Sequence, residues 1–158
     1  MPSSRSKIKT PQRLCTLRQL WGWEGKTVVF TNGVFDILHA GHLQLLERAR
    51  ALGDVLIVGI NSDASARRLD KGSGRPVNRL QDRAALLAGF GCVDAVVAFG
   101  EDTPERLLSR LKPDIQVKGG DYRPDQVPEA RHAGRLVLVK LKSGYSTTGL
   151  IRRLQGRS

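Results

Sequence analysis

Two histidines three residues apart, His39 and His42, are the side chains of this sequence best placed to act together on an anion. On the first turn of a helix, residues three apart face the same way, so both imidazoles would lie over one phosphate-sized site. Gly41 between them would leave room for a ligand to approach the backbone. Each histidine could instead be a capping or packing residue. The pairing favours function, because two of the three histidines of the chain fall in this four-residue window.

A metal site is the other chemistry that two neighbouring histidines could serve. Helical metal ligands are usually four residues apart and are joined by cysteine or carboxylate ligands. No such cluster is visible around residues 39–42, and Cys15 and Cys92 lack Cys-x-x-Cys spacing. We therefore predict that the protein holds no metal in a cage of its own, and that both thiols are reduced.

A strand and a glycine turn precede the histidines and would position them. Residues 27–31 are apolar and β-branched, which is typical of a central parallel strand. Asn32 and Gly33 end this strand, and apolar residues at helical spacing begin near Gly41. Unpaired N–H groups and the helix dipole at such a helix start bind anions. The sequence therefore predicts a phosphate site here.

Strand-like and helix-like segments alternate through the rest of the chain. Four further buried strands are predicted at residues 54–60, 94–99, 113–118 and 135–140. Helices are predicted over residues 79–90, 103–111 and from residue 146 onward. This alternation specifies an α/β fold with a Rossmann-like, doubly wound, five-stranded parallel sheet. The polar segments that follow the strands should converge at one edge of the sheet.

Three of these polar segments have either a structural or a binding role. Asn61 and Asp63 could cap the helix that follows them or line the ligand crevice. Ser146 is a natural N-cap, and the same hydroxyl-rich helix start could donate to a nucleotide phosphate. The paired glycines after Lys118 suit close approach of the backbone to a ring or a phosphate, and the lysine would add a positive charge.

Residues 71–76 form a glycine-rich, cationic loop, which is typical of a mobile segment. Such a loop can close on an anionic substrate, so that Lys71 and Arg75 contact its phosphates. An ordinary surface linker is the alternative. Arg83 lies on the helix that follows, opposite its apolar face, and is expected to be free to meet a phosphate or Asp36.

The net charge of +11 is concentrated at the two ends of the chain. Residues 1–18 and 131–158 hold 12 of the 26 basic residues and none of the 15 acidic ones, which leaves the middle nearly neutral. We expect residues 1–18 to be a partly disordered basic arm and residues 19–158 to be a single domain. A short helix is predicted at residues 14–20, and Trp21 and Trp23 are expected in the core or in a subunit contact.

Nucleic acid and membranes are not indicated as partners. No helix-turn-helix, zinc or RNA-binding aromatic pattern accompanies the basic residues. No apolar run approaches the length of a membrane span, and the N-terminus lacks the apolar core of a signal peptide, so we expect a cytoplasmic protein. A nicotinamide dehydrogenase and a Walker-type phosphate loop are disfavoured, because neither glycine fingerprint is present.

The motif His-Ala-Gly-His at residues 39–42, behind Thr-Asn-Gly-Val-Phe-Asp at residues 31–36, resembles the signature of the cytidylyltransferase-like nucleotidyltransferases. Residues 58–63, 75–77, 117–122 and 146–148 extend the resemblance to the adenylyltransferases that activate D-glycero-β-D-manno-heptose 1-phosphate. No kinase half accompanies the motif, so the resemblance implies the stand-alone form. Val34 and Tyr145 depart from it, because such sequences often have cysteine at these two positions.

The resemblance implies transfer of AMP from ATP to the heptose phosphate, with Mg²⁺, in a homodimer, for lipopolysaccharide inner-core or related glycan synthesis. Lys71 would join the two histidines in catalysis. Residues expected to hold the nucleotide, besides the histidines, are Thr31, Asn32, Gly33, Phe35, Lys118, Gly119, Gly120, Asp121, Ser146, Thr147 and Thr148. Residues expected to hold the sugar phosphate are Asp36, Asn61, Asp63, Lys71, Arg75 and Arg83.

The chemistry needs no general base, because a phosphate monoester is already ionised at pH 7. His39 and His42 are expected to donate hydrogen bonds to the reacting phosphates, and Mg²⁺ to be held largely by substrate and water. A cytidylyltransferase acting on glycerol 3-phosphate or a similar alcohol phosphate is the alternative enzyme. A basic nucleic-acid-binding module and a catalytically silent nucleotide sensor are the alternatives that are not enzymes.

Overall fold

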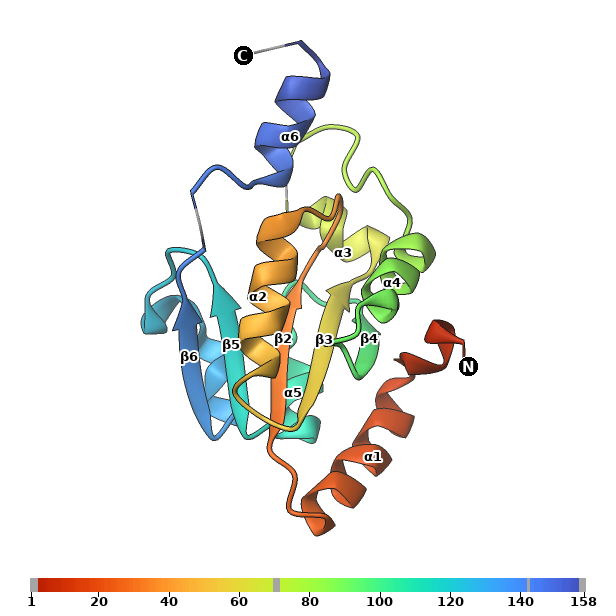
Figure 1. The fold of residues 1–158 in the computed structure, drawn as a ribbon, viewed down its shortest axis with the longest axis vertical. Coiled ribbons are helices and arrows are strands. Elements are labelled where there is room, and N and C mark those ends of the chain that lie inside the picture. Colours follow the sequence, from red (N-terminus) through yellow and green to blue (C-terminus); the bar gives the residue numbers. More distant parts are fainter. Residues whose placement is uncertain (1–2, 70–71, 142, 157–158) are drawn as a thin grey trace.

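The computed structural model of the protein describes residues 3–69, 72–141 and 143–156. A single sheet of parallel strands, in the order β1-β4-β3-β2-β5-β6, forms its centre (Figure 1). The strands are β1 (Ile8–Lys9), β2 (Val28–Gly33), β3 (Val55–Asn61), β4 (Ala95–Phe99), β5 (Ile115–Gly119) and β6 (Arg135–Val139). The doubly wound parallel sheet is confirmed, with six strands in place of the five expected, because β1 adds to one edge.

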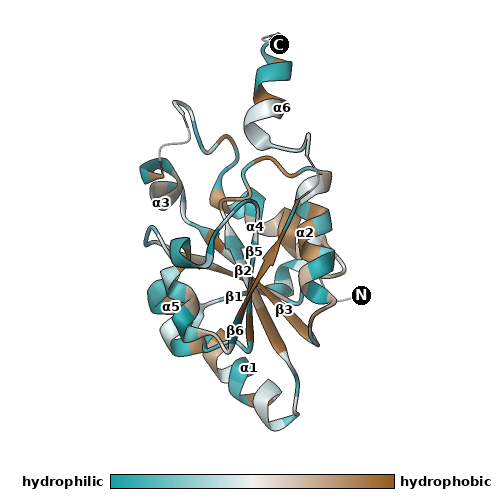
Figure 2. Cartoon of the chain, turned by 90° about the vertical axis from the view of Figure 1, so that its left-hand side faces the viewer, coloured by the Kyte–Doolittle hydropathy of each residue, from teal (hydrophilic) through white to brown (hydrophobic). Residues whose placement is uncertain are grey.

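Helices cover both faces of this sheet, and its strands are the most hydrophobic segments (Figure 2). The helices are α1 (Pro11–Trp23), α2 (Ala40–Arg50), α3 (Asp63–Arg68), α4 (Leu80–Gly89), α5 (Glu105–Leu111) and α6 (Thr147–Leu154). Short 3-10 helices span Ser4–Lys7, Pro124–Gln126 and Pro128–His132. None of the helices described is long and apolar enough to cross a membrane.

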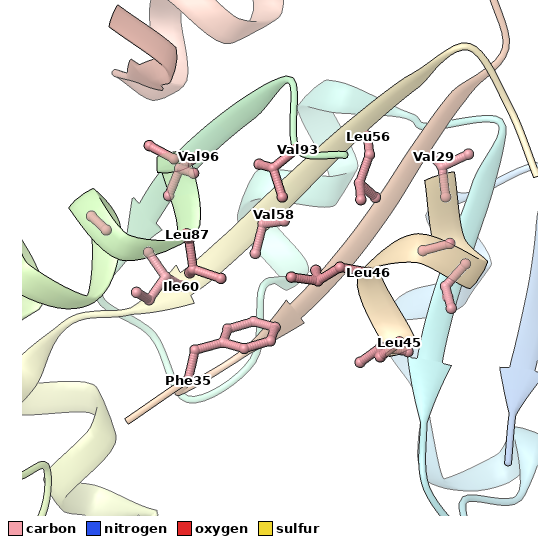
Figure 3. Close-up of a cluster of buried hydrophobic side chains, with 14 of the residues drawn as sticks. Val29, Phe35, Leu45, Leu46, Leu56, Val58, Ile60, Leu87, Val93 and Val96 are labelled. Atoms are coloured by element: carbon pink, nitrogen blue, oxygen red, sulfur yellow. The ribbon is translucent and has the colours of Figure 1, made fainter. Parts of the chain in front are cut away.

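Two hydrophobic clusters, one on each face, fix the sheet between its helices. Side chains alternate along β2, so Val29 packs with α2 and α4, whereas Phe30 packs with α1 and α5. Figure 3 shows the first cluster, in which Leu46 of α2 and the ring of Phe35 lie near Val58 of β3. Phe35 lies two residues after β2, so the loop that leads to the histidines is anchored in the core.

Residues 3–18, which the sequence predicts to be a partly disordered basic arm with a short helix from residue 14, form a 3-10 helix, β1 and the first part of α1. β1 pairs in parallel with β4, and Lys7 Nζ donates to the carbonyl of Phe90 at 3.0 Å. Thr10 caps α1, and Leu14 is fully buried in the second cluster. A two-residue strand is too short to produce a periodic pattern. Because basic residues surround this one, the sequence predicted a charged arm and not a strand.

The two tryptophans of α1 differ in their surroundings. Trp21 packs against the second cluster, as expected of a core residue. Trp23, in contrast, is 81% exposed, so the core assignment is wrong for this side chain. It lies on the last turn of α1, at the end of the molecule opposite to α6 (Figure 1).

Gln116 on β5 is a polar residue in the second face of the sheet and gives a prediction about stability. It is fully buried, and in the described part of the chain neither its amide nitrogen nor its oxygen has a hydrogen-bond partner. Because an unpaired buried amide costs free energy, Gln116→Met, of similar shape, should raise the free energy of unfolding by about 1 kcal/mol in urea titrations. Gln19→Met, at an exposed position of α1, should change it by less than about 0.5 kcal/mol. A loss of stability in Gln116→Met would contradict the prediction.

Candidate active site

His39 and His42 lie at the start of α2, next to the C-terminal end of β2. His39 is the N-cap residue: its Nδ1 accepts from the N–H of Gly41 at 3.1 Å. His42 completes a reciprocal cap, because its Nδ1 accepts from the N–H of His39 at 3.3 Å. The two rings stack, with centroids 3.9 Å apart and planes at 26°. Both histidines therefore cap the helix, which was the structural alternative, and their rings also face the same way, as a shared anion site requires.

The caps determine where each imidazole carries its hydrogen. A ring nitrogen that accepts a hydrogen bond has no hydrogen of its own, so in the neutral ring the hydrogen is on Nε2. Burial lowers the pKa of His39, which favours its neutral form at pH 7. His39 and His42 therefore have Nε2–H as their donor groups, which is what contact with a phosphate oxygen requires.

Phe35 holds the other side of the histidine pair. Its ring centroid lies 5.3 Å from that of His42, and its side chain is buried. Its φ is +49°, an uncommon value for a residue with a side chain, which costs about 1–2 kcal/mol. This backbone turn places the ring of Phe35 in the core while the chain continues toward His39. The expected donor role of the Phe35 N–H stays a prediction.

The sequence predicts that Asp36 contacts the sugar phosphate, but in the structure its side chain does not face outward. Its carboxylate is buried, with Oδ2 accepting from Arg75 Nε at 2.7 Å and from the N–H of Val77 at 3.0 Å. Oδ1 accepts from the N–H of Asn78 at 3.0 Å. Burial alone would raise the pKa of Asp36, but these hydrogen bonds and the charge of Arg75 outweigh it, and the pKa is lowered. Asp36 therefore fixes the segment of residues 75–78.

Arg83 is not free to meet a phosphate, because its side chain is fully buried. Nη1 donates to the carbonyl of Val34 at 2.7 Å and to that of Asn61 at 2.9 Å, and Nε donates to the carbonyl of Asn78 at 3.0 Å. Nη2 pairs with Asp63 Oδ1 at 2.6 Å. Four of its five N–H groups thus join the loops after β2 and β3 to the segment before α4. Helical periodicity placed Arg83 opposite the apolar face of α4, and the surrounding loops cover the side of the helix on which Arg83 lies.

The ends of β5 and β2 supply the other predicted polar groups. Lys118 Nζ lies 3.4 Å from Asn32 Oδ1 and 5.3 Å from the ring centroid of Tyr122. Gly120 has a φ of +121°, a value that favours glycine, so the chain turns sharply after β5. The hydroxyl of Thr31 is buried and has no hydrogen-bond partner among the residues described. Lys118, Asn32 and Thr31 thus lie at neighbouring strand ends, and Tyr122, which was not among the predicted site residues, lies beside Lys118.

The C-terminal segment reaches the histidine motif. Ser146 is the N-cap of α6, as predicted, and its Oγ accepts from the N–H of Gly149 at 2.9 Å. Thr147 Oγ1 donates to the carbonyl of Ile37 at 3.2 Å, which ties the start of α6 to the loop before His39. Residues more than 100 positions apart are thereby brought together.

The outcome for the remaining predicted positions is mixed. The expected space beside Gly41 is taken, because a Cβ there would lie 2.9 Å from the Cβ of Tyr145. Asn61 is buried, and its Nδ2 donates to Ser65 Oγ at 2.9 Å, which favours its structural role. Asp121 and Thr148 are exposed. Lys71 lies outside the described residues.

Asp36→Asn tests the fixing of residues 75–78. The substitution removes the charge that pairs with Arg75, so hydrogen exchange at the amides of Val77 and Asn78 should accelerate. The free energy of unfolding should fall by about 1–3 kcal/mol at pH 7. Because the pKa of Asp36 is lowered in the folded state, this stabilisation is present above its unfolded pKa of about 3.9 and is lost as the pH falls through the folded value.

The matched control for Asp36→Asn is Asp102→Asn. Asp102 forms an exposed pair with Arg68 at 2.8 Å, and exposed pairs contribute less than about 1 kcal/mol. The two variants should therefore differ at pH 7 and converge in strong acid. Equal stabilities at pH 7 would show that residues 75–78 are held by other contacts.

Comparison with known proteins gives the family. The cytidylyltransferase-like family matches residues 30–153. The D-beta-D-heptose 1-phosphate adenylyltransferase of Bordetella bronchiseptica is 52% identical over 134 residues, which cover 82% of this chain and 83% of that protein. The bifunctional protein HldE of Syntrophotalea carbinolica is 49% identical over 156 residues, or 96% of this chain and 32% of that protein.

A solved structure agrees with this match. The lipopolysaccharide core biosynthesis protein from Thermoplasma volcanium superimposes with a TM-score of 0.64 at 29% identity, and the match covers 77% of this chain and 100% of that one. The chain spans about a third of the length of the bifunctional relatives and most of the length of the Bordetella protein. With the family motif at the edge of a parallel sheet and these matches along most of its length, the chain belongs to the cytidylyltransferase-like family.

Proposed function

We propose that the protein transfers AMP from ATP to D-glycero-β-D-manno-heptose 1-phosphate, giving ADP-heptose and pyrophosphate. The observation that carries the proposal is the stacked, backbone-capped pair of His39 and His42 at the C-terminal edge of the sheet. The choice of substrates is supported by the Bordetella relative, which bears the name of this activity at 52% identity. The product would serve lipopolysaccharide inner-core or related heptose glycan synthesis.

The proposed reaction is a direct displacement. One oxygen of the heptose phosphate, already ionised at pH 7, attacks the α-phosphorus of ATP, and the bond from that phosphorus to the β-phosphate oxygen breaks. Negative charge increases on the phosphate oxygens as the two anions meet. The Nε2–H groups of His39 and His42 would donate to these oxygens and stabilise the transition state. No proton has to be removed from the nucleophile.

Three segments would hold the nucleotide. Two of them follow β5 and begin α6, namely Lys118 to Asp121 and Ser146 to Thr148. The third is the backbone at Asn32, Gly33 and Phe35, which would lie nearer the phosphates. The buried hydroxyl of Thr31, which has no hydrogen-bond partner in the described part of the chain, supports a contact with bound substrate, because a ligand would supply that partner. Lys71 and Arg75 would meet the sugar phosphate, while Asp36 and Arg83 hold the loops around it.

Mg²⁺ fits this site as a companion of the triphosphate. The ion prefers several oxygen ligands, and among the residues described no group of three His, Cys, Asp or Glu side chains could hold a metal. Asp36, the carboxylate closest in sequence to the histidines, is engaged with Arg75. Substrate phosphates and water would therefore supply the ligands, and the bound ion would neutralise part of the phosphate charge.

The experiment that tests the function is a substrate panel with pyrophosphate release as the readout. ATP and CTP are each combined with heptose 1-phosphate and with glycerol 3-phosphate, in the presence of Mg²⁺. We expect release with ATP and heptose 1-phosphate only. Release with CTP and glycerol 3-phosphate would establish the alternative enzyme, and ATP binding without release from any pair would indicate a nucleotide sensor.

We further propose a cytoplasmic homodimer. The exposure of Trp23 supports the tryptophan region of α1 as the contact, because an exposed tryptophan is unusual on a monomer surface. Light scattering of the protein and of Trp23→Ser tests this. A dimer that persists in the variant would place the contact elsewhere.

A further inference from the structure

Tyr145 is a residue of the site that neither the motif nor the nucleotide-binding role of α6 explains. Its ring centroid lies 6.2 Å from that of His39, with planes at 22°. Together with the stacking of His39 on His42 and the contact of His42 with Phe35, this makes a row of four rings. The buried ring of Phe35 closes one end of the row, and Tyr145, 47% exposed, closes the other.

The backbone around Gly41 is shaped to accept Tyr145. A Cβ on residue 41 would lie 2.9 Å from the Cβ of Tyr145 and 3.0 Å from two ring atoms of His39, closer than real Cβ contacts normally are. Glycine is therefore what lets the C-terminal segment approach the start of α2 this closely. The hydrogen bond from Thr147 Oγ1 to the carbonyl of Ile37 anchors the same segment two residues further on.

We infer that Tyr145 is a positioning residue that covers His39 from the solvent side and holds the start of α6 against the histidine pair. Figure 1 shows the start of α6 beside the upper end of α2, where the strands of the sheet end. Two segments that the proposed function assigns to the nucleotide, the histidine pair and residues 146–148, are thus joined through one side chain. This inference rests on the proposed function for its effect on turnover, but not for its effect on His39.

Covering His39 has a consequence for its titration. Burial is the cause of the lowered pKa of His39, and among the residues described the titratable groups that pack against its ring are His42 and Tyr145. Protonation of His39 would put a hydrogen on Nδ1 and end its acceptance from the N–H of Gly41. A ring that keeps His39 partly buried therefore also keeps the cap, and with it the position of Nε2, at neutral pH.

The test compares Tyr145→Ala with Tyr145→Phe in the full chain, by NMR titration of the histidine side chains. The signals of the three histidines are assigned with His42→Gln and His132→Gln. We expect the pKa of His39 to rise toward its ordinary value in Tyr145→Ala and to stay unchanged in Tyr145→Phe, which keeps the ring. Leu86→Ala, which removes an exposed apolar side chain from α4, should leave it unchanged.

Turnover gives the second readout. With ATP and heptose 1-phosphate, Tyr145→Ala should lower kcat/KM for ATP by about tenfold and move the acid limb of its pH profile upward, whereas Tyr145→Phe should restore both. An unchanged pKa of His39 in Tyr145→Ala overturns the inference, whatever the turnover. A pKa that rises in a protein without transferase activity would retain the inference and reject the proposed function. The same rise in the pKa of His39 in Tyr145→Phe would assign the effect to the tyrosine hydroxyl and contradict the inference that the ring covers His39.

Discussion

Replacing His42 by alanine should lower turnover by about 10²–10³-fold while the protein stays folded. The factor is what loss of one preorganised donor to a transition state typically costs. The ring of His42 is one of two stacked imidazoles whose Nδ1 atoms are used by backbone N–H groups, so its Nε2–H is the group that the substitution removes from the reaction. The side chain bears no other part in the proposed chemistry.

The fold should survive because α2 is held by its apolar face. Leu45, Leu46 and Ala49 are buried in the first cluster, whereas His42 contributes a capping hydrogen bond of 3.3 Å and ring contacts at the start of the helix. Loss of a capping side chain costs about 1 kcal/mol. Urea titration should therefore show a small decrease in the free energy of unfolding, far below the loss of transition-state stabilisation.

Steady-state pyrophosphate release at saturating ATP and heptose 1-phosphate is the measurement. His132→Ala is the matched control, because His132 pairs with Glu105 of α5, on the other face of the sheet, at 2.6 Å. It should leave turnover within about twofold of the unaltered protein. Turnover of His42→Ala within threefold of normal would remove His42 from the catalytic mechanism.

Sequence periodicity was sufficient for the layers of the fold and for the position of the histidines. β2 is apolar or β-branched from Val28 to Thr31, and α2 has its leucines at helical spacing, so both could be predicted. β1 could not, since two residues carry no period and its stability comes from the edge of β4. The polar segments also converge at one edge of the sheet, as the alternation of strands and helices required.

The sequence did not indicate which polar side chains form contacts within the protein and which are left to bind a ligand. Asp36 and Arg83 are both charged residues of the kind expected at a substrate site, but backbone N–H and carbonyl groups of the surrounding loops compete for them. Whether a loop or a ligand satisfies a charged side chain depends on contacts between segments more than 20 positions apart. Tyr145 was noted only as a departure from the family pattern, because its partner His39 lies over 100 residues away.

Arg83→Leu should lower the free energy of unfolding by about 3–5 kcal/mol, the largest loss of stability expected for a single substitution near the site. Removing one member of a buried ionic network leaves the other groups without partners. Here the carbonyl oxygens of Val34, Asn61 and Asn78 would each lose a donor. Asp63 would lose less, because its side chain is 33% exposed and water can replace the arginine.

Arg83→Lys separates the charge of Arg83 from its geometry. Lysine keeps the positive charge and can still reach Asp63 or one carbonyl group, but a single ammonium cannot donate to three loops in the directions that a planar guanidinium allows. We expect it to recover less than half of the stability lost in Arg83→Leu. Arg67→Leu, an exposed arginine on α3, should cost less than about 0.5 kcal/mol in the same urea titrations.

Turnover of the folded Arg83→Lys protein then decides whether the network serves only stability. The carbonyl of Val34 belongs to the loop between β2 and the N-cap of α2, so a weakened tie at this point should let Phe35 and the histidine pair shift. Because misplacement of a catalytic group by about 1 Å can cost 10²-fold, we expect kcat to fall by at least tenfold at temperatures where the variant is fully folded. Normal kcat in a folded but destabilised Arg83→Lys protein would confine Arg83 to stability and leave Phe35, buried in the core, as the residue that holds the histidine loop in place.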